Sequence, residues 1–185
     1  MSLDKLYAAS GHPVDFATGQ LAFDGLTILG YYGAMLAAGT FGTYVQTQMF
    51  DFAFIASATF FGICLGTLIA RLGQASCATV SMGIGAAFFA FSGGTLDALE
   101  NLMSFWLTQF ETAIPQMLAY IYSSFAALKF ISLTIAMTLA IAAIVTGLIS
   151  GGMRMIRPTQ RVKNKRKAPN RKLRVRGFFI SILVL

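Results

Sequence analysis

Side chains that could carry out chemistry are few in this 185-residue chain. The only histidine, His12, precedes a proline near the N-terminus, so one chain offers neither paired imidazoles for haem nor a Ser/His/Asp triad. Cys64 and Cys77 lie in apolar stretches without a CxxC motif, and no phosphate-binding glycine loop is present. The sequence therefore predicts a protein that is not an enzyme and that has no cofactor and no metal site.

The clearest polar pattern lies between residues 95 and 111. Polar side chains recur there at spacings of three and four, which is typical of one face of a helix: Asp97, Glu100, Asn101, Ser104, Thr108 and Glu111. Gly93 and Gly94 precede Thr95, a good helix N-cap. This pattern predicts an amphipathic helix that lies flat at a membrane surface with its acids in water. It either connects two spans or docks a partner.

A basic tail, residues 154–185, follows the last apolar stretch. It contains no acid and ends in the apolar sequence GFFISILVL. Such a tail predicts binding to anionic lipid, with non-specific contact to nucleic acid or insertion into an acidic groove of a partner protein as alternatives. The residues expected to bind an anionic surface are Arg154, Arg157, Arg161, Lys163, Lys165, Arg166, Lys167, Arg171, Lys172, Arg174 and Arg176.

These groups must be positioned by a strongly apolar chain. Hydrophobic residues make up 56% and charged residues 11% of the sequence, too few charges to cover a water-facing surface. The fold class expected is an all-α integral membrane protein with four spans, at about 25–47, 50–70, 73–93 and 130–153, together forming one transmembrane domain, 25–153. The N-terminal segment, 1–24, precedes it.

Charge asymmetry predicts the orientation. All seven acids lie in residues 1–111, whereas twelve of the fourteen basic residues lie after residue 111. By the positive-inside rule, Arg71 and the tail belong on the cytoplasmic side, and four crossings then place both termini there. We expect a bacterial inner membrane, or the membrane of a virion or an organelle.

The segment between Pro115 and Met153 is too long for a simple span. As one helix it would extend about 57 Å, nearly twice the thickness of a bilayer core. We expect Pro115 to break the chain, an interfacial or re-entrant segment to run up to Lys129, and the Lys129 ammonium to reach the membrane surface. A fifth span at 105–127 is the alternative.

Small residues recur at every fourth position along three predicted spans. Such rows let helices approach closely in a membrane, so they are expected helix-packing sites. The rows comprise Gly30, Ala34, Ala38 and Gly42, then Ala58, Gly62, Gly66 and Ala70, then Gly73, Cys77, Ser81 and Gly85.

The function expected from this sequence is that of a non-catalytic subunit of a larger membrane assembly, such as a secretion or conjugation channel, a virion membrane or an energy-transducing complex. Its partners would be the lipid bilayer and other membrane subunits or copies of itself. The alternative is a small oligomeric pore, for example of the holin kind, with a lumen lined by the small-residue rows.

Overall fold

The computed structural model describes residues 3–73 and 76–156, with no side-chain placement for Asp4 or for 151–156. The chain divides into two units, 1–150 and 151–185, and the description below concerns the first. The described residues form helices and no strand. The helices are α1 (Leu3–Ala9), α2 (Phe16–Gln20), α3 (Gly25–Ala37), α4 (Phe41–Leu72), α5 (Cys77–Leu107) and α6 (Gln116–Ile156).

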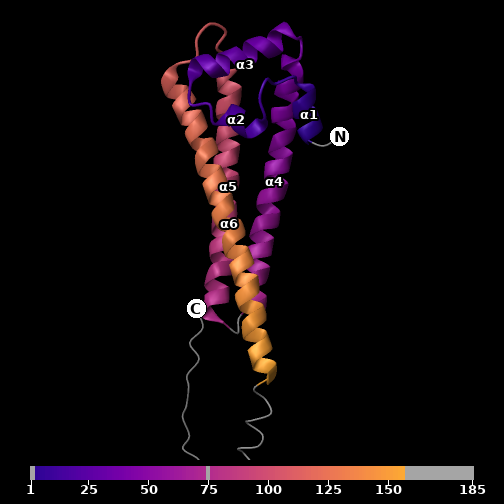
Figure 1. The fold of residues 1–185 in the computed structure, drawn as a ribbon, viewed down its shortest axis with the longest axis vertical. Coiled ribbons are helices and arrows are strands. Elements are labelled where there is room, and N and C mark those ends of the chain that lie inside the picture. Colours follow the sequence, from indigo (N-terminus) through magenta and orange to yellow (C-terminus); the bar gives the residue numbers. More distant parts are fainter. Residues whose placement is uncertain (1–2, 74–75, 157–185) are drawn as a thin grey trace, which may run out of the picture. The chain divides into compact units, whose positions relative to one another are not determined.

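Three long helices run alongside one another, with α1, α2 and α3 gathered near one end (Figure 1). A Cβ added at Gly62 of α4 would meet Ala90 of α5, and one added at Gly73 would meet Thr79, so the two helices are antiparallel. In the same way Gly93 and Gly85 of α5 lie against Leu133 and Leu139 of α6. The helices α4 and α6 therefore both run antiparallel to α5.

Among the described residues, three helices are long and apolar enough to cross a membrane: α4, α5 and α6 up to Ser150. The sequence-based expectation of an all-helical membrane-type fold agrees with this. The predicted span boundaries differ from the observed helix bounds in three places: within 25–47, after residue 93, and between Pro115 and Lys129.

The predicted first span, 25–47, is two helices. Asp24 caps the start of α3 by accepting a hydrogen bond from the Thr27 N–H at 2.8 Å. The helix ends at Gly39, which has a φ of +70°. The Thr40 N–H bonds back to the Met35 carbonyl at 2.9 Å and the Gly39 N–H to the Leu36 carbonyl at 3.0 Å, the pattern of a glycine C-cap. The rest of the predicted span begins α4.

The predicted third span, 73–93, and the predicted surface helix, 95–111, form a single helix. Ser76 caps α5, which continues through Gly93 and Gly94 to Leu107. Both glycines make close contacts, because a Cβ at Gly93 would lie 2.7 Å from Leu133 Cδ2 and one at Gly94 would overlap Thr59. The prediction of a helix start at Thr95 was wrong, since these glycines allow close packing within a helix.

The segment after Pro115 is also one helix. Pro115 lies directly before α6, in agreement with the predicted break of the chain, and its carbonyl accepts a hydrogen bond from the Leu118 N–H at 2.9 Å. From there α6 runs from Gln116 to Ile156 without interruption at Lys129. The interfacial or re-entrant segment expected before Lys129 is therefore incorrect. So is the fifth span at 105–127, because residues 108–115 are a loop.

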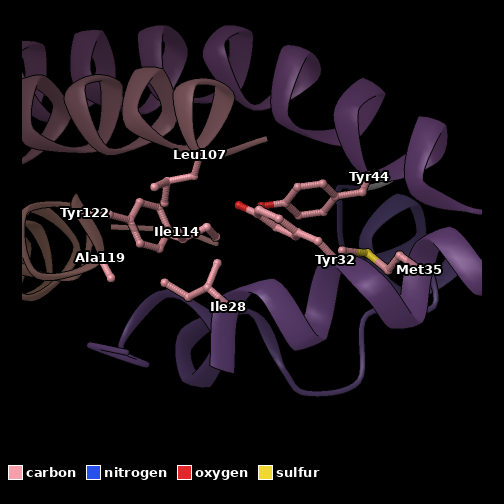
Figure 2. Packing of buried hydrophobic residues seen from close by; sticks show 8 residues of the cluster. All are labelled: Ile28, Tyr32, Met35, Tyr44, Leu107, Ile114, Ala119 and Tyr122. Carbon is pink, nitrogen blue, oxygen red and sulfur yellow. The ribbon is translucent and has the colours of Figure 1, made fainter. Parts of the chain in front are cut away.

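A large apolar core joins α3 to the ends of the long helices. Figure 2 shows Tyr32 and Met35 of α3 near Tyr44 of α4, with Ile28, Leu107, Ile114, Ala119 and Tyr122 in the same cluster. Each of these side chains is no more than 6% exposed. We call this end of the first unit the cap: α1–α3, residues 41–50 of α4, 101–115, and residues 116–128 of α6.

Beyond the cap the long helices pack through small residues. The second core cluster contains Ile69 of α4, Ala86 of α5, and Ala140 and Ala143 of α6. Gly66 lies against Gly83 and Ala87, where an added Cβ would be 2.6 Å from the Ala87 nitrogen. Because lipid is as apolar as these side chains, close approach of helix backbones must hold this part together.

Gly66 gives a direct test of the close helix contact. Changing Gly66 to Ala should lower the free energy of unfolding by about 1–3 kcal/mol, because the new Cβ meets backbone atoms that cannot move aside independently. Gly30→Ala is the matched control, since the structure leaves open space around Gly30 and alanine is the better helix former. Equilibrium unfolding in mixed detergent micelles measures both changes. Equal effects would contradict the packing described for α4 and α5.

Candidate functional site

A buried lysine holds two acids between α5 and α6. The Lys129 ammonium donates to Asp97 Oδ1 at 2.6 Å and to Glu100 Oε2 at 2.5 Å. The side chains of Lys129 and Glu100 are 3% and 0% exposed, and Asp97 is 16% exposed. A buried charge is costly unless it is paired and hydrogen-bonded, so each of these groups requires the others.

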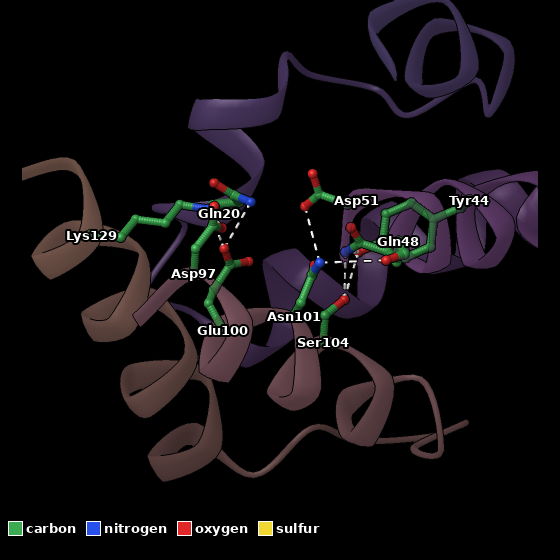
Figure 3. Close-up of polar contacts among 9 residues, drawn as sticks. All are labelled: Gln20, Tyr44, Gln48, Asp51, Asp97, Glu100, Asn101, Ser104 and Lys129. Carbon is green, nitrogen blue, oxygen red and sulfur yellow. Dashed lines mark hydrogen bonds and ion pairs between the residues drawn. The ribbon is translucent and has the colours of Figure 1, made fainter. Parts of the chain in front are cut away.

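The short helix α2 covers this ion pair. Gln20, at its end, donates from Nε2 to Glu100 Oε2 at 3.0 Å, and Figure 3 shows both Gln20 and Lys129 directed at the same carboxylate. The Lys129 ammonium also lies 5.4 Å from the centre of the Phe16 ring. Asp15 caps α2 by accepting from the Thr18 N–H at 3.0 Å. We call Gln20, Asp97, Glu100 and Lys129 the acid–lysine cluster.

A second cluster of polar side chains, next to the acid–lysine cluster, links α4 to α5. The Asn101 amide donates to Asp51 Oδ2 at 3.0 Å, and the Gln48 amide donates to Tyr44 OH at 2.9 Å and to Ser104 Oγ at 2.7 Å (Figure 3). All five side chains are buried. We call these residues, Tyr44, Gln48, Asp51, Asn101 and Ser104, the amide cluster.

The two clusters contain more hydrogen-bond acceptors than donors. Within the described residues, the Glu100 Oε1, Asn101 Oδ1 and Gln48 Oε1 atoms are buried without a hydrogen-bond partner. Three carboxyl groups, those of Asp51, Asp97 and Glu100, lie in this layer with the single ammonium of Lys129. The arrangement therefore has an excess of negative charge when its acids are ionised.

The N-terminal segment is fixed in place by aromatic contacts. The His12 ring lies 5.1 Å from the ring of Tyr7 and 4.9 Å from that of Tyr31, and its Nδ1 is 3.0 Å from the Val14 carbonyl oxygen. Burial lowers the pKa of His12, because loss of hydration disfavours the imidazolium. These contacts hold the chain that leads into α2.

The predicted polar stripe is real, but its orientation is the reverse of the one expected. Glu100, Asn101 and Ser104 are each 0% exposed, whereas Leu102 and Trp106 on the other face are 56% and 54% exposed. The prediction that these acids face water was wrong, with Glu111 in the loop as the exposed exception. Lys129 likewise does not reach the surface, because the two carboxylates on α5 bind it inside the bundle.

The structure places some residues of the predicted small-residue rows in helix contacts and leaves the others exposed. On α4 and α5, the glycines Gly62, Gly66, Gly73 and Gly85 lie close to a neighbouring helix or side chain, and Ala70 lies against Gly83. The row of Gly30, Ala34, Ala38 and Gly42 is exposed, as are Ala58, Cys77 and Ser81. Sequence reasoning missed Gly83, Gly93 and Gly94. The spacing of four from Ala86 through Ala90 to Gly94 was a signal that could have identified the true contact face of α5.

An apolar cleft of about 390 Å³ lies between α4 and α6, with α5 as its floor. Phe54 and Phe61 of α4 line one side, and Leu133, Met137 and Ile141 of α6 line the other. Asp97 is the one charged residue among those that line it. The acid–lysine cluster therefore reaches the open side of the bundle at this point.

The residues expected to bind an anionic surface, from Arg154 to Arg176, lie outside the side chains that the structure describes. In residues 3–73 and 76–150, no three His, Cys, Asp or Glu side chains are grouped so that they could hold a metal ion. Comparison of the chain with protein-family models, with characterised proteins and with solved structures finds no match.

The acid–lysine cluster can be tested by removing its ammonium. Lys129→Met should lower the free energy of unfolding by about 3–5 kcal/mol, because two carboxylates are left buried without a counter-charge. Adding Asp97→Asn and Glu100→Gln to the same variant should restore most of this loss. Unfolding in mixed micelles measures both, with Lys5→Met as an exposed control. If the triple variant is no more stable than Lys129→Met, the loss of stability does not come from the two unpaired carboxylates.

Proposed function

We propose that this protein is a non-catalytic integral subunit of a larger membrane assembly, which acts by helix packing and by docking to other subunits. The observation that carries the proposal is the length of its exposed apolar surface.

Charges on the long helices define a membrane slab. Asp51 and Arg71 are 20 positions apart on α4, which is about 30 Å of helix and the thickness of a hydrocarbon core. On α5, Asp97 is likewise 20 positions from Cys77 at the helix start. Lys129 of α6 bonds to Asp97, so it lies at the level of Asp51 and Asp97. We place the bilayer core between this charge layer and the end of the bundle at Arg71.

This placement implies three crossings. The basic run of the sequence begins at Arg154, in the last turn of α6, and Gly147 lies near Thr79 at the Arg71 end. Arg71 and the tail then share the cytoplasmic side, in accordance with the positive-inside rule. The N-terminal segment lies with the cap on the opposite side. This is where the proposal departs from the four-span expectation, which placed both termini in the cytoplasm.

Exposed apolar side chains continue well beyond such a slab. The described part of α6, Gln116–Ser150, has 35 residues, about 52 Å of helix. Met117 and Tyr120 near its start are 69% and 49% exposed, and Ile141 and Leu148 near its end are 56% and 72% exposed. A core of about 30 Å would cover this length only at a tilt of about 55°, against an average near 20°. The cap surface therefore needs a protein partner.

The cap has few charges with which to face water. Its exposed large residues include Leu26, Leu36, Met49, Phe50, Leu102 and Trp106. Among its described charged side chains, Lys5, Asp15 and Glu111 are exposed and Asp24 is partly exposed. Exposed large apolar side chains in such number are typical of an interface between subunits.

The structure lends less support to a pore lined by the small-residue rows. The glycines of α4 and α5 are used in contacts within one chain. The row from Gly30 to Gly42 remains open, but it carries no polar side chain that would line a water-filled lumen. We therefore prefer the subunit to the pore.

Topology can be tested by cysteine labelling. In a background with Cys64 and Cys77, both free and exposed, replaced by alanine, we expect Ala17→Cys and Thr112→Cys to react from one side of the membrane and Leu72→Cys from the other. An impermeant maleimide applied to right-side-out and inverted vesicles makes the measurement. Reaction of positions 17 and 112 from opposite sides would support four crossings instead of three.

Assembly can be tested by photocrosslinking in native membranes. A benzophenone amino acid in place of Trp106 or Met117, both exposed on the cap, should form protein adducts of defined size. The same amino acid in place of Leu68, exposed within the slab, should react chiefly with lipid. A chain that yields no protein adduct from the cap and is a monomer by light scattering would contradict the proposed role as a subunit.

A further inference from the structure

We propose that the cleft between α4 and α6 binds a transmembrane helix of a different protein, one that carries a single lysine or arginine at the depth of Asp97. The inference rests on the proposed role as a subunit and names the chemistry of one partner. Its support comes from the shape of the cleft, the charges at its end, and the absence of a suitable base elsewhere in the described chain.

The cleft has the surface that a helix needs. Its floor and sides contain the small residues Ala58, Gly62, Ala90, Ala136 and Ala140, and its rims are large apolar residues, Phe54 and Met137 among them. Small residues allow a second backbone to approach closely, which is what drives association between helices in lipid. Ala58 and Met137 are exposed, and Met137 is 63% exposed, so the groove is open to the membrane.

The charged residues at the end of the cleft restrict the chemistry of the partner more than the shape of the cleft does. Asp97 lines the cleft and is 16% exposed, and Lys129 occupies only its Oδ1 atom. The same ammonium also neutralises Glu100, whose Oε1 atom has no hydrogen-bond partner among the described residues. When both acids are ionised, the local balance is two carboxylates to one ammonium, with Asp51 a third carboxyl group in the layer. A basic side chain entering along the cleft would meet Asp97 and reduce this excess.

The described part of a second copy of the chain does not fit this requirement. Of the basic side chains that the structure describes, Lys129 is already buried in its own ion pair and Arg71 lies about 30 Å of helix from the charge layer. Lys5 belongs to α1, in the cap. The described helices therefore carry no free base at the depth of Asp97.

Model helices provide the probe. We would reconstitute the full chain in phosphatidylcholine vesicles with labelled leucine–alanine helices of about 20 residues that carry one Lys, Gln or Glu at the level of Asp97. Energy transfer to a donor on the protein measures binding. The Lys helix should bind at least about tenfold more tightly than the Gln helix, because a desolvated charge pair is lost in the latter. The Glu helix should bind most weakly.

Variants of the protein separate charge from shape. Asp97→Asn should abolish the preference for Lys over Gln. Ala58→Leu should fill the cleft and weaken binding of the Lys helix without touching the ion pair, so it serves if Asp97→Asn does not fold. Ala56→Leu, on an exposed position of the same helix outside the cleft, should have no effect.

Three results would overturn the inference. Equal binding of the Lys and Gln helices would show that Asp97 does not recognise a base. Unchanged binding by Ala58→Leu would place the interaction elsewhere. Loss of binding when ethanolamine lipid replaces part of the choline lipid would identify a lipid amine as the occupant. None of these results would alter crosslinking from Trp106 or Met117, so failure here remains distinct from failure of the subunit proposal.

Discussion

The buried ammonium of Lys129 is the constraint on which the structure depends. It must reach Asp97 and Glu100 together, and those carboxylates lie one turn apart on α5. A buried ion pair adds little net stability over an apolar contact, but separating its members costs several kcal/mol. Alternative packings of α5 and α6 are therefore penalised. A slip of one residue would turn Lys129 by about 100° away from α5 and leave three charges buried alone.

The position of the polar stripe could be predicted from the sequence, but the direction in which it faces could not. Spacings of three and four identify a helical face wherever they occur, and they correctly united Glu100, Asn101 and Ser104. In water the apolar face of such a helix would turn inward. In this fold Leu102 and Trp106 face outward, and the polar face turns inward, where Glu100 pairs with Lys129 of α6 and Asn101 with Asp51 of α4. The period of a pattern is local, whereas its direction depends on the partners that the tertiary structure brings to it.

The positions of helix ends also could not be predicted from the local sequence alone. Gly39 ends α3 because its positive φ lets the chain turn back onto the last carbonyls. Gly93 and Gly94 do not end α5, because Leu133 and Thr59 occupy the space that side chains would have filled. A glycine in an apolar stretch is compatible with both outcomes. Which one holds depends on a helix more than thirty residues away in sequence, so the count of spans required the tertiary structure.

The distribution of polar and apolar side chains restricts the surroundings in which the chain is stable. Within the described residues, many polar side chains are buried in the acid–lysine and amide clusters, and exposed side chains on both sides of that layer include Phe60, Trp106 and Met117. Lipid can solvate such a surface over about 30 Å of helix length. Over the remaining length an apolar surface in water would be unstable, and the cap has its own packed core, so it cannot collapse further to hide it. The interior of the first unit is well packed, whereas this apolar surface is the part that the proposed contact with another subunit would cover.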